Sequence, residues 1–106
     1  MRRAAKVDAN QSEIVDHVRA AGWCVHIAAP LGGGFLDLVC AYDGFTALLE
    51  AKDGSKSPSE RRLTKDQVKF TSKWPGMWAV AESPDQALAA LNRMKADYDR
   101  RVLDRA

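Results

Sequence analysis

The chain has 106 residues, 46% of them hydrophobic and 28% charged, with a formal net charge of +2. Such a composition is typical of one soluble folded domain and excludes a disordered chain. No apolar run approaches the roughly 20 residues of a membrane span, and the basic start lacks the apolar stretch of a signal peptide. Cys24 and Cys40 lie in separate apolar runs without zinc-site spacing. We therefore expect a single domain, spanning 1–106, in a reducing cytoplasm.

The first predicted elements are a helix and a strand. Asp8-Ala9-Asn10 can begin a helix and Gly22 can end it, because apolar residues recur at helical spacing between them: Ile14, Val15, Val18 and Ala21. Residues 23–28 then alternate, which predicts a strand with Trp23, Val25 and Ile27 on one side. The glycine-rich segment 30–34 ends that strand.

A β-hairpin is predicted next. The β-rich runs 35–42 and 45–52 are separated by Asp43-Gly44. A two-residue type I′ turn needs positive φ at both positions, and Asp-Gly is one of the pairs that adopt it readily. The polar and basic stretch 53–62 follows as a loop.

The remaining elements are two helices that flank a short strand, predicted at 77–82. Thr64 and Gln67 have the spacing of a capping box, and Leu63 and Val68 have that of a hydrophobic staple. The helix they begin should end at about Trp74, before Pro75-Gly76. A final helix begins with a second capping box, from Ser83 to Gln86, and continues through Leu88, Leu91, Met94, Tyr98 and Val102. The order α-β-β-β-α-β-α predicts an α/β fold.

The hairpin turn determines which residues face each other. With Asp43-Gly44 as the turn, residues equally distant from it are opposite, so Asp37 faces Glu50. Facing residues share one side of the sheet, with Cβ atoms roughly 4.5–5.5 Å apart. Lys52 lies two residues beyond Glu50 and projects from the same side.

Two facing carboxylates in an apolar sheet are energetically costly. Like charges opposite each other destabilise a sheet, and burial adds a desolvation cost. Lys52 could pair with one carboxylate, one carboxyl group could keep its proton through a raised pKa, or a divalent cation could bind both. The alternative without chemistry is a buried ion pair that only stabilises the fold, although apolar residues usually do this better.

Three segments together resemble a known family. Gly33-Gly34-Phe35-Leu36-Asp37-Leu38, Leu49-Glu50-Ala51-Lys52 and Leu63-Thr64-x-x-Gln67 resemble the PD-(D/E)XK nuclease superfamily, most closely its small VRR-NUC and Holliday-junction-resolvase-like branch of phages and microbes. Leu36 stands where many members have proline. The resemblance implies a restriction-endonuclease-like αβββαβ core with a mixed central sheet over residues 8–92. A basic arm (1–7) would precede this core and a C-terminal helix extension (93–106) would follow it.

The resemblance also implies a chemistry, the hydrolysis of DNA phosphodiester bonds with Mg²⁺, for which Mn²⁺ can substitute. Asp37, Glu50 and the Ala51 backbone carbonyl would hold the metal, which activates water and polarises phosphate. Lys52 would orient that water or offset charge on the phosphate.

Two further residues have a weaker connection to this site. The resemblance places Gln67 near the catalytic residues, although its capping role is a sufficient explanation of its position. Glu13, on the first predicted helix, corresponds to an acid that often joins the metal site in the superfamily. It is equally well explained as an ordinary exposed glutamate.

Basic residues gather in the segment 52–73 and at the N-terminus. They are interpreted either as a solvated surface or as a face that contacts DNA phosphates. The glycines at 32–34 form either a plain turn or a place where the backbone approaches DNA closely. On the second interpretation, the DNA contacts are Arg2, Arg3, Lys6, Gly33, Gly34, Lys56, Arg61, Arg62, Lys65 and Lys69.

Several functions remain open at this point. The resemblance implies an endonuclease for branched or structured DNA, such as a Holliday junction, in a bacterial or phage-infected cell. The alternatives are a non-catalytic DNA-binding or assembly module that retains the fold, and a nuclease that nicks duplexes irrespective of their shape. No membrane contact or nucleotide cofactor is expected. Because symmetric cutting of two strands needs two centres, we expect a homodimer, with a candidate interface at Leu91, Met94, Tyr98 and Val102.

Overall fold

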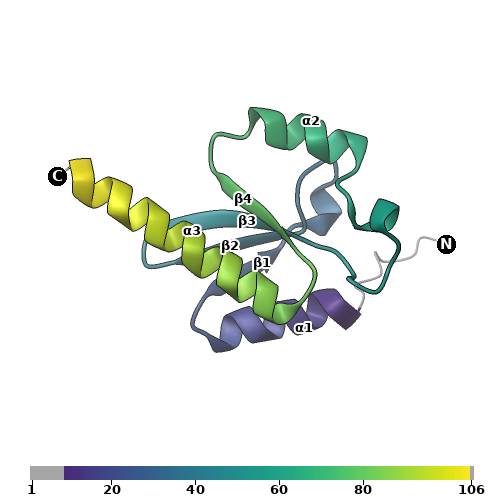
Figure 1. Ribbon diagram of the computed structural model, residues 1–106, viewed down its shortest axis with the longest axis horizontal. Coiled ribbons are helices and arrows are strands. Elements are labelled where there is room, and N and C mark those ends of the chain that lie inside the picture. The colour runs from purple at the N-terminus through teal and green to yellow at the C-terminus, as the bar shows by residue number, and fades with distance from the viewer. Residues whose placement is uncertain (1–8, 106) are drawn as a thin grey trace.

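The computed structural model describes residues 9–105, which form a four-stranded sheet and three α-helices (Figure 1). The elements are α1 (Ala9–Ala20), β1 (Cys24–Ile27), β2 (Leu38–Tyr42), β3 (Phe45–Ala51), α2 (Lys65–Lys73), β4 (Met77–Ala81) and α3 (Pro84–Arg105). Two short 3₁₀ helices, η1 (Ala29–Leu31) and η2 (Pro58–Arg61), lie in the connecting segments. The predicted order of elements and the α/β class are confirmed.

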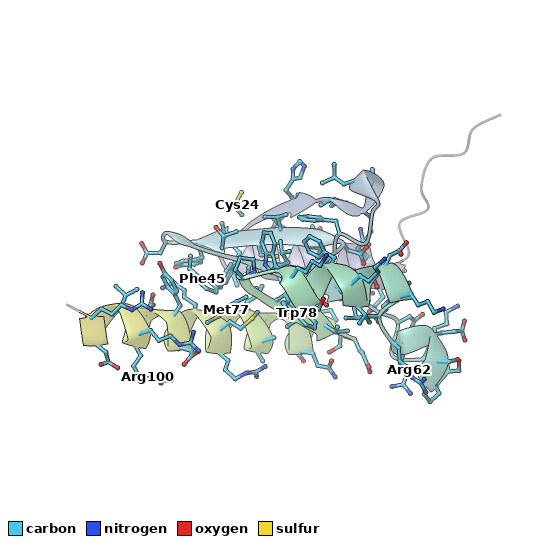
Figure 2. The ribbon with its side chains drawn as sticks, turned by 90° about the horizontal axis from the view of Figure 1, so that it is seen from above. Cys24, Phe45, Arg62, Met77, Trp78 and Arg100 are labelled. Atoms are coloured by element: carbon cyan, nitrogen blue, oxygen red, sulfur yellow. The ribbon has the colours of Figure 1, made fainter. Side chains whose placement is uncertain are left out.

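The strands form a mixed sheet in the order β1-β2-β3-β4. The first two pairs are antiparallel, and β3 pairs with β4 in parallel. A parallel pair needs a long crossover connection, and the segment that contains η2 and α2 provides it. Figure 1 shows α1 and α3 packed together on one side of the sheet and α2 on the other. Figure 2 shows Cys24 at one edge of the sheet, away from Met77 and Trp78 on β4.

The hairpin has the predicted turn and register. Asp43 and Gly44 have φ angles of 48° and 81°, both positive as a type I′ turn requires. Tyr42 is paired with Phe45, and the ladder continues in that register to the other end of the strands.

The helix ends match the predicted capping motifs in part. Gly22, with a φ of 99°, ends α1 in a Schellman motif, in which the Trp23 N–H donates to the Val18 carbonyl. The capping box of Thr64 and Gln67 at α2 is confirmed. At α3, Ser83 accepts a hydrogen bond from the Gln86 amide as predicted, but the Gln86 side chain accepts from the Glu82 N–H instead of completing the box. Val68 is 53% exposed, so the predicted staple does not bury it.

The hydrophobic core lies between the sheet and the helices α1 and α3. It contains Val18 of α1, Leu38 and Leu49 of the hairpin, and Leu91 of α3. Because successive side chains of a strand alternate between faces, Leu48 and Glu50 lie on the opposite face, on the side of α2. An aromatic cluster of Phe35, Phe70 and Trp74 packs α2 against the segment that leads into β2.

The structure corrects part of the homodimer interface that was predicted on α3. Leu91 is fully buried and is not available to a partner, whereas Met94 is partly buried and packs against the core of the same chain. Tyr98 and Val102 are 41% and 45% exposed. They lie in the C-terminal half of α3, which extends beyond the sheet (Figure 1). Within the described residues, none of the helices is long and apolar enough to cross a membrane.

The two cysteines differ enough in environment to be distinguished chemically. Cys24 is exposed, whereas burial raises the pKa of the Cys40 thiol to about 12. Because the thiolate is the nucleophile, we expect an aromatic disulfide reagent at about pH 8 to titrate one thiol per native chain quickly. Unfolding in urea should make the second reactive, and Cys24→Ser should abolish the fast phase. Two equally fast thiols in the native protein would contradict the burial of Cys40.

Candidate active site

The structure brings Asp37 and Glu50 together where β2 begins and β3 ends. The Asp37 N–H donates to Glu50 Oε1 at 3.1 Å, and the Ala51 N–H donates to Asp37 Oδ2 at 3.2 Å. These reciprocal contacts follow directly after the last backbone pair, Leu38 with Leu49. The two carboxylates are therefore neighbours on the α2 side of the sheet, as the hairpin register predicts.

Lys52 supplies a positive charge at the same position. Its Nζ lies 3.2 Å from Glu50 Oε2, and the two side chains are only 15% and 5% exposed. Of the three ways to relieve the carboxylate conflict, the structure contains the ion pair. Removing one member of such a buried pair leaves an uncompensated charge, at a typical cost of about 3–5 kcal/mol.

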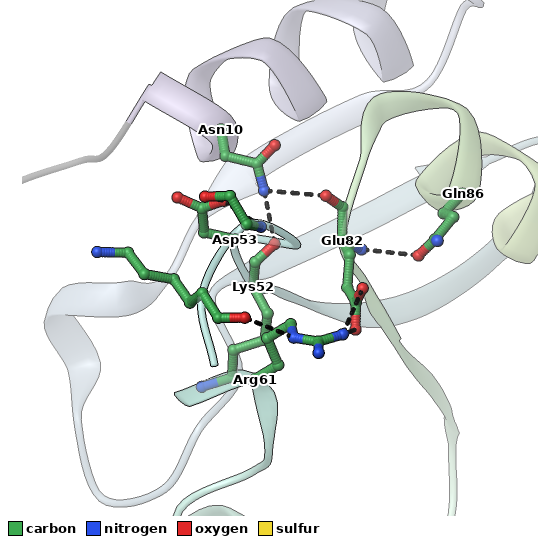
Figure 3. Close-up of polar contacts among 8 residues, drawn as sticks. Asn10, Lys52, Asp53, Arg61, Glu82 and Gln86 are labelled. Atoms are coloured by element: carbon green, nitrogen blue, oxygen red, sulfur yellow. Dashed lines mark hydrogen bonds and ion pairs between the residues drawn. The ribbon is translucent and has the colours of Figure 1, made fainter. Parts of the chain in front are cut away.

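Asn10 holds the backbone of Lys52 and was not anticipated as a site residue. Its Nδ2 donates to the Lys52 carbonyl at 2.6 Å and to the Glu82 carbonyl at 3.3 Å (Figure 3). The Lys52 N–H donates to the Ala81 carbonyl, so both backbone groups of Lys52 are satisfied. The sequence predicts only that Asn10 lies at the start of a helix. Its partners are 42 and 72 residues away, beyond the reach of any local pattern.

The oxygen donors at this position suit a hard divalent cation. Within an extended strand, the N–H and C=O of one residue point to the same side. The Ala51 carbonyl therefore lies on the side of β2, where its N–H meets Asp37. Two carboxylates and a backbone carbonyl fit Mg²⁺, which is usually bound through one or two carboxylates plus water. Within residues 9–105, no group of three or more His, Cys, Asp or Glu residues could hold a metal.

Glu13 is not brought to the pair. It is exposed on α1, while Gln11, only 7% exposed, occupies the inward position. The reason is helical geometry: Gln11 lies three residues before Ile14 and seven before Val18, so it extends their stripe by one turn. That periodicity was available in the sequence and indicates Gln11 as the polar residue that α1 buries beneath the sheet.

Gln67 and the glycines meet at the start of α2. Gln67 is buried, and its Oε1 accepts a hydrogen bond from the Thr64 N–H at 3.0 Å. The backbone of Gly34 packs against the Asp66 carbonyl so closely that an added Cβ would overlap it. This close approach explains Gly34 without DNA. Gly33 lies in open space and lines a hollow of about 350 Å³ together with Asp66, Lys69, Phe70 and Lys73.

The basic residues predicted to contact DNA differ in their availability. Arg2, Arg3 and Lys6 lie outside the described residues. The guanidinium of Arg61 is engaged by Glu82, at 3.4 Å. The others are exposed side chains of the loop before α2 and of α2 itself: Lys56, Arg62, Lys65 and Lys69.

Comparisons with protein-family models, curated proteins and solved structures found no match. The chemistry at this position is therefore inferred from the arrangement of Asp37, Glu50 and Lys52.

A matched pair of glycine substitutions tests the packing next to this site. Gly33 and Gly34 have φ angles of 65° and 85°, so alanine at either position adopts an unfavourable left-handed conformation, costing about 1–2 kcal/mol. At Gly34 the new Cβ also meets the Asp66 carbonyl. We expect Gly34→Ala to lower the free energy of unfolding, measured by urea denaturation, by ~1–3 kcal/mol more than Gly33→Ala does. Equal losses would show that α2 does not pack on Gly34 in this way.

Proposed function

We propose that this chain is a metal-dependent endonuclease with a restriction-endonuclease-like fold, which hydrolyses phosphodiester bonds in branched or structured DNA. The observation that supports this most strongly is the hydrogen-bonded pair of Asp37 and Glu50, with the Lys52 ammonium 3.2 Å from Glu50. The α/β order of elements and the mixed sheet are compatible with that fold. In this proposal, charges that are costly in a purely structural role are retained because they act on a substrate.

Each residue has a separate task in the proposed reaction. Mg²⁺, when bound, would polarise the scissile phosphate and lower the pKa of a coordinated water. Asp37, Glu50 and the Ala51 carbonyl would hold the cation. The Lys52 ammonium offsets negative charge that develops on the phosphate oxygens. Asn10 keeps the Lys52 backbone in place, and burial keeps competing water away from the Glu50 carboxylate.

Exposed cations on α2 and on the loop before it support DNA as the substrate. Lys65 and Lys69 are exposed on α2, and Lys56 and Arg62 on the loop before it. Cations on one face bind a phosphate backbone mainly by releasing its counterions, and they do so without regard to sequence. The specificity for branched DNA rests on the family resemblance alone.

Cleavage assays test the proposal directly. Labelled four-way-junction and linear DNA would be incubated with Mg²⁺, Mn²⁺ or EDTA. We expect metal-dependent cleavage, favouring the junction, and a loss of at least about 100-fold in Asp37→Asn, which removes a charge from the metal site. Asp97→Asn, which removes a half-buried carboxylate on α3, serves as the matched control and should cleave normally.

Each other outcome contradicts part of the proposal. DNA binding without cleavage by the wild type would favour the non-catalytic module, in which the buried pair of Glu50 and Lys52 is purely structural. Equal cleavage of both DNA shapes would favour a duplex-nicking nuclease. Undiminished cleavage by Asp37→Asn would exclude this site.

Substitution of Lys52 separates metal binding from catalysis. Lys52 and a cation compete for the Glu50 carboxylate, so Lys52→Met should bind Mn²⁺ at least as tightly as the wild type in calorimetry. The same variant should lose cleavage by at least about 100-fold, because the phosphate charge is no longer offset. Far-UV circular dichroism would check that the variant folds. If neither protein binds Mn²⁺, the pair is not a metal site.

We also propose that the active form is a homodimer, because one chain carries one cleavage centre and both strands of a junction must be cut. Tyr98 and Val102 on the extended part of α3 are the exposed apolar residues that suit such an interface. Sedimentation at micromolar concentration, with and without junction DNA, should show two chains per particle. A monomer in both conditions would contradict this.

A further inference from the structure

The basic loop, residues 53–62, meets the end of the sheet at Glu82, against which the Gly54 backbone packs and to which Arg61 is paired. Arg61 Nε donates to the Lys56 carbonyl at 2.9 Å, within the loop. Arg61 Nη1 lies 3.4 Å from Glu82 Oε1 and 3.5 Å from Oε2, at the end of β4 (Figure 3). The guanidinium therefore connects the loop to the sheet end that also carries the candidate active site.

Exposure separates Arg61 from the other cations of the loop. The side chains of Arg61 and Glu82 are 30% and 31% exposed, so both are largely covered. Lys56 and Arg62 are exposed, and Figure 2 shows Arg62 at the end of the molecule away from the projecting end of α3. Lys56 and Arg62 can reach a large anionic partner, whereas Nε and Nη1 of Arg61 already donate to Lys56 and Glu82.

The rest of the loop is ordered by short-range bonds. Asp53 Oδ1 accepts hydrogen bonds from the Ser55 N–H and hydroxyl, and Ser57 and Glu60 form a capping box at η2. These bonds hold the pKa values of Asp53 and Glu60 below their ordinary range, so both are ionised at neutral pH. All of these contacts stay inside the loop. They fix its internal shape, whereas the polar side-chain contact that joins the loop to Glu82 comes from Arg61.

Glu82 is itself held firmly. Its N–H donates to Gln86 Oε1 at 2.9 Å, and its carbonyl accepts from Asn10 Nδ2. Asn10 also binds the Lys52 carbonyl. Asn10 thus holds both the end of β3 next to Lys52 and the backbone of Glu82, whose carboxylate pairs with Arg61.

We propose that the ion pair of Arg61 and Glu82, called the strut below, holds the basic loop in its DNA-binding orientation, with Lys56 and Arg62 contacting phosphates. Arg61 is then a positioning residue. It is not the phosphate contact that the sequence alone had suggested. The partner in this inference rests on the proposed function, whereas the strut itself does not.

Glu82→Gln distinguishes the two roles of Arg61 because they predict opposite signs. If Arg61 contacted phosphate, removal of the neighbouring negative charge would tighten binding. If Arg61 is a strut, Glu82→Gln and Arg61→Gln should each weaken binding by a similar factor, about 5- to 10-fold for the loss of one or two phosphate contacts. The double variant should be no weaker than either single one, because both substitutions break the same contact.

Binding would be measured by fluorescence anisotropy with four-way-junction DNA in EDTA, which prevents cleavage. Asp97→Asn is the matched control, because it removes one carboxylate that is paired with Arg100 and Arg101 on α3, away from the loop. We expect it to bind within about twofold of the wild type, or slightly tighter. Tighter binding by Glu82→Gln, together with weaker binding by Arg61→Gln, would overturn the inference.

A second readout needs no DNA. Limited trypsin digestion reports loop opening through cleavage after Lys56 and Arg62, which remain in every variant. We expect both rates to rise by a similar factor in Glu82→Gln and Arg61→Gln and to stay unchanged in Asp97→Asn. Equal rates in all four proteins would overturn the strut. A wild type that binds no DNA, yet shows the rise in digestion, would overturn the proposed function and leave the strut supported.

Discussion

Everything in the proposed site depends on placing two carboxylates next to each other on one face of a sheet. Each carboxylate accepts a backbone N–H from the other strand, Glu50 from Asp37 and Asp37 from Ala51. Lys52 pairs with Glu50, the more deeply buried of the two acids. The Asp43-Gly44 turn sets the register that makes this possible, at the far end of both strands. A slip by one residue would move one acid into the apolar core. The fold and the candidate chemistry thus share one constraint.

The surroundings of this pair are built to prevent movement. Asn10 of α1 and Ala81 of β4 hold the backbone of Lys52 from two sides. Gly34 lets the start of α2 pack closely beside the approach to Asp37. Catalytic groups lose efficiency when their supports are loose, so rigid support of this kind is consistent with chemistry at the pair. The same supports would also suit a static ion pair, which is why the distinction needs a measurement with metal.

The parts of the structure that the sequence could predict are those determined by neighbours along the chain. The type I′ turn, the capping box at Thr64 and the stop at Gly22 are local signals, and each is observed. The facing of Asp37 and Glu50 follows from the turn by counting. The roles of Asn10 and Arg61 could not be predicted, because both depend on Glu82, which only the folded sheet brings near. Glu13 was named because of the family resemblance, whereas the helical period pointed to Gln11 as the buried polar residue of α1.

Paramagnetic broadening by Mn²⁺ in an amide NMR spectrum tests the central claim most directly. If a cation binds between the carboxylates, substoichiometric Mn²⁺ should broaden the amide signals of Asp37 and Ala51 first and leave Gly44, at the opposite end of the hairpin, sharp. Asp37→Asn should weaken this selective effect. Broadening that is absent, or that spreads evenly over exposed acidic residues, would contradict a metal site at this pair and, with it, the proposed hydrolase.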